Sequence, residues 1–202
     1  MMIDTYARID RVLPALPGWC TPAKGRRLAD LVIEARAQLC VELGVFGGRS
    51  LVAMALGLAH QGSGRVDGID PYTVQAALEG SNAPANDEWW STLDYGQILA
   101  AAHKGISDSA LMAHARIVIA RSQDVVGSYT PGSIDVLHQD SNHSEEVSTA
   151  EVRAWLPLVR SGGFWVIDDI DWPTTEQAQR LLAASGCERV ETHGSWAIYR
   201  KG

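Results

Sequence analysis

The chain has 202 residues, 46% of them hydrophobic, and a formal net charge of −7 at pH 7. A chain of this length supports one sizeable hydrophobic core, so we expect a single domain over residues 1–202. The acidic balance, with no basic run longer than KGRR at 24–27, argues against nucleic acid as a partner.

Helix and strand patterns alternate along the chain. A helix is expected over 21–39, because Thr21 suits the N-cap, Pro22 suits the first turn, and apolar residues recur at helical spacing. A short apolar run then breaks into glycines at VELGVFGGRS, 41–50, and a second helix is expected over 50–60. Further strands are expected at 64–70, 115–122, 133–140 and 162–169.

The last third of the chain completes this pattern. The helix after the fourth strand carries apolar residues on one face, at Val147, Ala150, Ala154 and Leu158. Gly162-Gly163 is expected to end that helix. The tail, CERVETHGSWAIYRKG, is two extended runs around a glycine, which is typical of a hairpin. We therefore expect an α/β fold with a Rossmann-like doubly wound, mainly parallel sheet and a C-terminal antiparallel hairpin.

One segment, residues 73–105, departs from the alternation. It is long, contains Gly, Ser, Asn and Pro, and carries the adjacent Trp89 and Trp90. Insertions of this length in a compact domain are usually lids or binding loops. We expect this segment to form a mobile cover outside the core, with its paired tryptophans facing an apolar ligand.

The glycine-rich turn after the first strand suits a nucleotide-type ligand. Gly44 and Gly47 lie at a strand-to-helix corner, where missing side chains let the backbone approach a ligand and the helix start offers free N–H groups. Asp70 ends the second strand, about where an acid reaches ribose hydroxyls in nucleotide-binding α/β folds. The dinucleotide fingerprint does not require the acid at Glu42, so this spacing favours another nucleotide-like cofactor.

With these residues the chain resembles the class I S-adenosylmethionine-dependent methyltransferases over residues 18–202. The first motif of that family has the form acid-x-Gly-x-x-x-Gly or a close variant, and a second-strand acid holds the ribose. The resemblance implies S-adenosyl-L-methionine as the cofactor. It implies that Glu42 contacts the methionine end of the cofactor, that Gly44 and Gly47 pass beneath it, and that Ser50 lies at the helix start. It also implies that Asp70 holds the ribose and that Ser122 and Gln123 contact the adenine.

Acidic residues also follow the fourth and fifth strands, at Asp140 and at Asp168-Asp169. Ligands of an open parallel sheet bind outside the carboxyl ends of the strands, so these carboxylates should converge on one crevice. The three carboxylates would repel one another unless a cation lay between them. Hard oxygen ligands in this number suit Mg²⁺, with Mn²⁺ or Ca²⁺ as alternatives. Helix capping by Asp140 and Asp168 is the other interpretation.

This arrangement resembles the metal-dependent O-methyltransferases of the catechol and macrolide-sugar types. Those enzymes take one Asp after strand four and an acidic or Asp-Asn pair after strand five, and they place a general base three positions after the first ligand. The resemblance therefore implies that Asp140, Asp168 and Asp169 bind metal and that Asp140 and His143 are catalytic. A histidine base is found in the sugar-modifying branch, and a substrate-contacting role for His143 stays open.

The predicted function is an S-adenosylmethionine- and Mg²⁺-dependent O-methyltransferase that acts on a small molecule with neighbouring hydroxyls, such as a sugar, a polyketide or a catechol-like compound. Trp19 and Thr21, in GWCTPAKG at 18–25, match the family segment that touches cofactor and acceptor. The alternatives are an NAD(P)-dependent oxidoreductase of Rossmann type and a non-catalytic relative that binds cofactor or metal.

A cytoplasmic location is expected. The first residues show no export signal, no apolar run approaches about 18 residues, and the three cysteines lack CxxC spacing. We therefore expect no membrane partner, and a homo-oligomer stays open.

Overall fold

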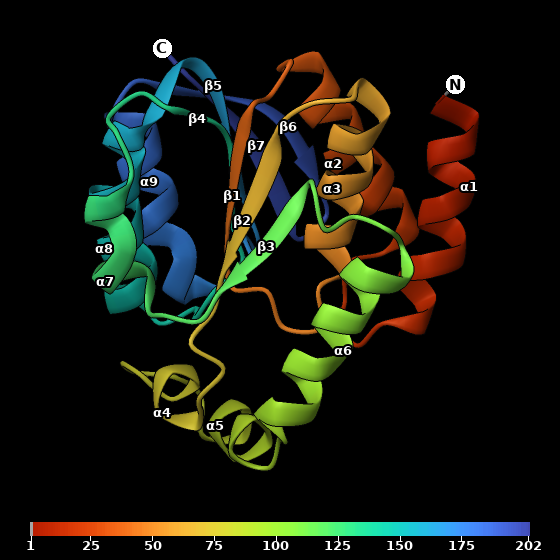
Figure 1. Cartoon of the computed structure of the whole chain (residues 1–202). Helices are drawn as coiled ribbons and strands as arrows, with labels where there is room; N and C mark the ends of the chain where they lie inside the picture. Colours follow the sequence, from red (N-terminus) through yellow and green to blue (C-terminus); the bar gives the residue numbers. More distant parts are fainter. Residues whose placement is uncertain (1) are drawn as a thin grey trace.

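The computed structural model describes residues 2–202, and within them lies a seven-stranded sheet of order β3-β2-β1-β4-β5-β7-β6 (Figure 1). The strands are β1 (Leu39–Leu43), β2 (Arg65–Ile69), β3 (Ala115–Val118), β4 (Ile134–Gln139), β5 (Val159–Ile167), β6 (Cys187–His193) and β7 (Trp196–Lys201). The first five strands run parallel, and β7 pairs antiparallel with both β5 and β6. The predicted parallel sheet with a terminal hairpin is confirmed.

Helices cover both faces of the sheet (Figure 1). One face carries α1 (Met2–Val12), α2 (Pro22–Glu34), α3 (Arg49–Gln61) and α6 (Tyr95–Asp108), and the other carries α8 (Glu145–Trp155) and α9 (Glu176–Ala184). The short elements are η1 (Leu13–Ala15), α4 (Val74–Ala77), α5 (Pro84–Ser91), α7 (Ser122–Val125), η2 (Val126–Ser128), η3 (Leu156–Leu158) and η4 (Pro173–Thr175). None of the helices within residues 2–202 combines the length and apolar character that a membrane crossing requires.

Side-chain alternation along the central strands divides the core into two layers. Cys40 and Val136 pack beneath α2 and α3, while Val41, Leu137 and Trp165 pack on the opposite side with α8 and α9. All five side chains are fully buried. Burial on both faces is typical of a parallel sheet, so polar side chains at this depth need internal partners.

Two predicted helix ends were wrong. α2 begins as expected, with Thr21 accepting a hydrogen bond from the Lys24 amide, but it ends at Glu34. Arg36 takes a left-handed conformation (φ 50°) and closes the helix with Schellman-type hydrogen bonds, a role in which glycine is commoner. α8 ends at Trp155, and Gly162-Gly163 instead lies in β5, where the register against β4 shifts.

The prediction that all of residues 73–105 lie outside the core was also wrong. α4 and α5 contain no buried residue and lie beyond the carboxyl ends of the strands (Figure 1). α6 instead packs against α3 and buries Ile98, Ala102 and Ile106. Its apolar residues follow helical spacing, which outweighs the polar composition of the preceding residues.

The backbone at Gly44 leaves no room for a side chain. Its φ of +84° disfavours an L side chain, and a Cβ there would lie 2.1 Å from the Asp140 carbonyl oxygen. Gly47 is comparably enclosed, because its Cβ would lie 2.3 Å from the Pro17 carbonyl oxygen. At both glycines the absent side chain makes room for the protein's own backbone.

Gly44→Ala should therefore destabilise the protein by about 3 kcal/mol, since it adds a steric clash to left-handed strain. Gly62→Ala is the matched control, because Gly62 has a similar φ of +79° and a Cβ added there would meet nothing within 4 Å. Its expected cost is about 1 kcal/mol. Urea denaturation of both variants measures the difference, and equal losses would contradict the close approach at Gly44.

Candidate active site

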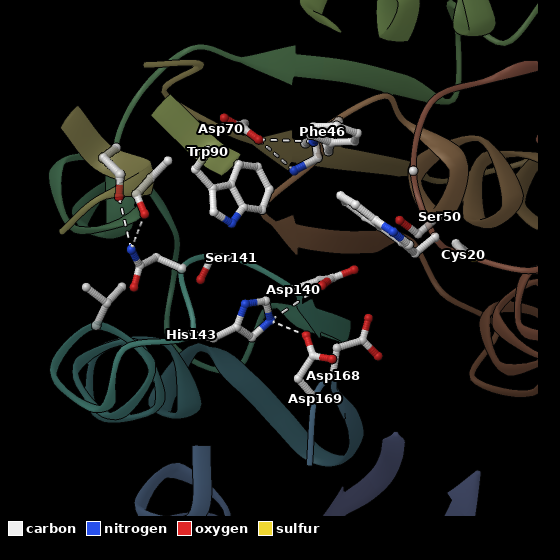
Figure 2. A pocket seen from close by; sticks show the side chains of 18 of the residues that line it. Cys20, Phe46, Ser50, Asp70, Trp90, Asp140, Ser141, His143, Asp168 and Asp169 are labelled. Carbon is white, nitrogen blue, oxygen red and sulfur yellow. Dashed lines mark hydrogen bonds and ion pairs between the residues drawn. The ribbon is translucent and has the colours of Figure 1, made fainter. Parts of the chain in front are cut away.

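A cavity of about 860 Å³ lies at the carboxyl ends of the parallel strands. Its walls come from the turn after β1, the ends of β2, β4 and β5, the segment containing α4 and α5, and the turn between β6 and β7 (Figure 2). Figure 2 shows Asp70 and Phe46 on one side and His143, Asp168 and Asp169 on the other, with Trp90 between them. A cavity of this volume suits a small organic ligand or cofactor.

Asp70 organises the glycine turn. Its Oδ2 accepts hydrogen bonds from the amides of Val45 (2.9 Å) and Phe46 (3.1 Å), and its Oδ1 accepts one from Tyr72 (2.8 Å). Burial raises the pKa of the Asp70 carboxyl, while these amide donors oppose that rise. The carboxylate lines the cavity, so it combines a structural role in the turn with exposure to a ligand.

The predicted adenine-contacting residues also line the cavity. Ser122 and Gln123 begin α7, and Ser50 lies in the first turn of α3. Ser122 Oγ donates to Glu151 (2.7 Å), which also accepts from Ser141 Oγ (2.6 Å). Burial raises the pKa of Glu151, and these hydroxyl donors oppose that rise. Glu151 thereby ties the turn after β3 to the end of β4.

Two residues that were predicted to contact the cofactor, Glu42 and Gly47, do not line the cavity. Glu42 is fully buried in β1 and, like Gly47, is not among the cavity-lining residues within 2–202. Glu42 Oε1 instead lies 2.8 Å from His138 Nδ1, its cross-strand neighbour in β4. In this conformation any effect of Glu42 on a ligand passes through other residues.

A buried chain of charged groups runs from Glu42 to α2. His138 lies between Glu42 and Asp168, with its Nε2 3.3 Å from Asp168 Oδ2. Lys24 Nζ donates to the same Asp168 oxygen and lies 4.0 Å from Asp140 Oδ2. Each member of the chain has an oppositely charged neighbour, the condition under which buried charges are tolerated.

These neighbours shift the protonation equilibria. Burial and the Lys24 charge favour neutral His138, but hydrogen bonds to Asp168 and Glu42 prevail and raise the His138 pKa to about 9. Burial favours neutral Lys24, but Asp168 and Asp140 prevail and raise its pKa. Burial opposes ionisation of Asp168, whereas Lys24 and His138 lower its pKa well below the usual range.

A second group faces the cavity more openly. His143 Nε2 lies 2.7 Å from Asp169 Oδ2 and 3.7 Å from Asp140 Oδ1 (Figure 2). Burial favours neutral His143, but Asp169 and Asp140 raise its pKa. Asp169 takes a left-handed conformation (φ 50°), which an aspartate tolerates better than most residues. His143 is thus placed to hold a proton beside two carboxylates.

The predicted metal ligands fall into two overlapping groups that share Asp140. Potential ligand atoms of His138, Asp140 and Asp168 lie within 4.8 Å of one another, as do those of Asp140, His143 and Asp169. Asp168 Oδ1 is buried without a hydrogen-bond partner among residues 2–202. This oxygen belongs to a residue grouped with Asp140, and an orphaned carboxylate oxygen there fits a hard divalent cation.

Four aromatic rings cluster at the cavity: Trp19, Phe46, Trp89 and Trp90. The ring centroids of Trp19 lie 5.1 Å from Phe46 and 5.4 Å from Trp89. Trp19 remains 65% exposed and Trp89 42% exposed, so the cluster presents an apolar surface to an incoming ligand. Thr21 lines the same cavity while capping α2.

Asn142 joins the loop after β4 to the segment containing α4. Its Nδ2 donates to the carbonyls of Ala76, Ala77 and Glu79 at the end of α4. A salt bridge between Arg121 and Glu79 (3.1 Å) holds the same segment to the end of β3. Contacts that leave every residue of α4 and α5 outside the buried core permit local opening.

The sequence interpretation missed Lys24 as a site residue and treated His138 as an ordinary strand residue. A signal for Lys24 was present, because it lies four positions before Leu28, on the apolar stripe of α2. His138 likewise lies inside a strand that is buried on both faces. Asn142 and Glu151 had no comparable local signal, since each depends on partners distant in the sequence.

The fold and the site define an α/β protein with a cavity of small-ligand size at the carboxyl edge of its sheet. Residues 41–170 match the family described as a methyltransferase domain, which covers most of the chain. The chain belongs to this methyltransferase family, as the sequence resemblance predicted. No curated protein matches the chain in sequence.

Solved structures of methyltransferases share the fold. The O-methyltransferase NovP is 14% identical with a TM-score of 0.72, and the match covers 98% of each chain. The O-methyltransferase from Bacillus cereus, solved in complex with SAH, is 21% identical with a TM-score of 0.66, covering 98% of this chain and 91% of that one. TomG from Streptomyces achromogenes, an O-methyltransferase of tomaymycin synthesis solved with SAM, is 17% identical with a TM-score of 0.64, covering 98% and 90%. These likenesses establish the class I methyltransferase fold.

Asn142→Ala should accelerate proteolysis within residues 73–94 about tenfold, because the two N–H groups of its side-chain amide hold three carbonyls of that segment by bonds of modest strength. Asn82→Ala is the control, since Asn82 donates only to the Glu79 carbonyl from within the same segment. Limited proteolysis followed by mass spectrometry locates the first cuts. First cuts elsewhere, or cutting rates unaffected by S-adenosylhomocysteine, would argue against a mobile cover.

Proposed function

We propose that this protein is an S-adenosylmethionine- and Mg²⁺-dependent O-methyltransferase that acts on a small molecule with neighbouring hydroxyls. The observation that carries the proposal is the placement of His143 and three aspartates at the cavity that the glycine turn borders. Family membership favours methyl transfer over the nicotinamide-dependent alternative. The complexes of the Bacillus cereus enzyme with SAH and of TomG with SAM support the same cofactor here.

The cofactor would lie along the glycine turn. Asp70 would accept hydrogen bonds from ribose hydroxyls, Ser122 and Gln123 would contact the adenine, and Ser50 would lie near the methionine end. Glu151 would hold Ser122 in place through their hydrogen bond. When bound, S-adenosylmethionine supplies an electrophilic methyl group on a sulfonium centre.

Asp140, Asp169 and the free Oδ1 of Asp168 would hold the divalent ion. The ion would supply Lewis acidity that favours ionisation of an acceptor hydroxyl. His143 would take the proton from that hydroxyl on the imidazole nitrogen that does not face Asp169, and the neighbouring Asp169 and Asp140 carboxylates would stabilise the resulting imidazolium. Asp169 would also orient the imidazole ring.

The acceptor would enter between this polar group and the aromatic cluster formed by Trp19, Phe46, Trp89 and Trp90. Residues 73–94 would cover the bound ligands and exclude water from the reacting atoms. The whole chain would act as one domain, with α6 holding the cover to the core.

Asp70→Ala should weaken S-adenosylhomocysteine binding about 10- to 100-fold, the usual cost of hydrogen bonds to a charged group. Isothermal titration calorimetry measures this, with NAD as the competing candidate ligand. Asp171→Ala is the control, because Asp171 is an exposed acid near the same end of the sheet. Tight binding of NAD with no binding of S-adenosylhomocysteine would refute the proposed cofactor.

Asp140→Asn should weaken Mn²⁺ binding at least about tenfold, because it removes a charge while keeping an oxygen. Electron paramagnetic resonance of free Mn²⁺ measures the affinity, and Asp171→Asn serves as the control. EDTA should also abolish methyl transfer to the acceptor. Full activity after chelation would exclude the metal from the mechanism.

A further inference from the structure

Lys24 occupies an unusual place for a lysine. It lies in the first turn of α2, only 8% exposed, and its ammonium donates to Asp168 Oδ2. The same nitrogen lies 4.0 Å from Asp140 Oδ2 and 5.6 Å from the centre of the Trp196 ring. A buried cation therefore lies beside two of the three carboxylates that would hold a divalent ion.

Lys24 and His138 together match the charges of Glu42 and Asp168. His138 contacts both Glu42 and Asp168, so two cationic side chains accompany these two carboxylates. From the sequence, the gathering of Asp140, Asp168 and Asp169 required an external cation. The fold supplies part of that positive charge itself, from α2 and β4.

We propose that Lys24 is the built-in counter-cation of the carboxylate cluster and competes with the divalent ion for Asp168. Lys24 engages Oδ2 and leaves only Oδ1 for a metal, which limits Asp168 to one ligand atom. A divalent ion bound there would also lie close to the ammonium in surroundings that screen charge weakly. Lys24 thus lowers metal affinity while it keeps the carboxylates together in the metal-free protein.

This inference rests on the proposed metal site and extends it to the order in which cofactor, metal and acceptor bind. A site that is partly neutralised before the ion arrives stays ordered without metal, so the cofactor finds a formed pocket. The ion then binds weakly by itself, and acceptor oxygens would supply the missing ligands. Lys24 acts through Asp168 and is a positioning residue.

Replacement of Lys24 by a neutral side chain tests the competition directly. Lys24→Met keeps the aliphatic length, and Lys24→Gln keeps a hydrogen-bond donor for Asp168. Calorimetric titration with Mn²⁺, in the presence of S-adenosylhomocysteine, should show at least about tenfold tighter binding in both variants than in the wild type. Lys104→Met is the matched control, since Lys104 is exposed and pairs with Asp108 on α6, and its affinity should be unchanged.

The outcomes separate this proposal from the proposed function. Wild-type binding of Mn²⁺ with equal or weaker binding in both neutral variants would overturn the role of Lys24 and leave the metal site standing. Lack of Mn²⁺ binding in every variant would overturn both, and titration with S-adenosylhomocysteine alone would still test the cofactor site. If Lys24→Met is too unstable to titrate, Mn²⁺ should raise the melting temperature of Lys24→Gln more than that of the wild type; an equal rise would contradict the competition.

Discussion

Backbone hydrogen bonds at the carboxyl edge of the sheet place the whole site. The Asp140 amide donates to the Leu43 carbonyl (2.8 Å), and the Asp168 amide donates to the Gln139 carbonyl (3.1 Å). The hydrogen-bonded ladders between β1 and β4 and between β4 and β5 therefore each extend one residue past the end of the strand. Neighbouring strands lie only about 4.8 Å apart, so these bonds force the carboxylates of two acids into one another's field. The two histidines and the lysine of the site lie around these two carboxylates, and the segment containing α4 and α5 lies above them.

Three basic side chains from separate elements lie against these carboxylates. β4 contributes His138, the loop after β4 contributes His143, and α2 contributes Lys24. Removing charges from water is costly, and the cost is offset only where partners satisfy each other. The alternating pleat puts Glu42 and His138 on the α2 side of the sheet, so docking of this helix completes the buried chain.

Core-anchored and surface parts of the site are divided between elements. Asp140 and Asp168 extend strands, and Asp70 is bound to the turn amides, which fixes their carboxylates against a packed core. α4 and α5 bury no residue and are held by hydrogen bonds such as those of Asn142 and by the aromatic contacts of Trp89 and Trp90. The charged groups are thus anchored to the core, whereas the segment above them is attached by surface contacts.

The sequence alone determined the alternating α/β order, the parallel sheet with its hairpin, and the acids at the strand ends, because hydrophobic periodicity and strand termini are local properties. The spacing of Asp140 and His143 on one loop was likewise local. The partners of the buried acids were not local, because Lys24 and Asp168 are 144 residues apart in the chain, and Ser122 and Glu151 are 29 apart. Only the docking of α2 and α8 on the sheet decided which charges meet, since side-chain pairing across elements depends on how helix faces pack and not on the pattern within either element.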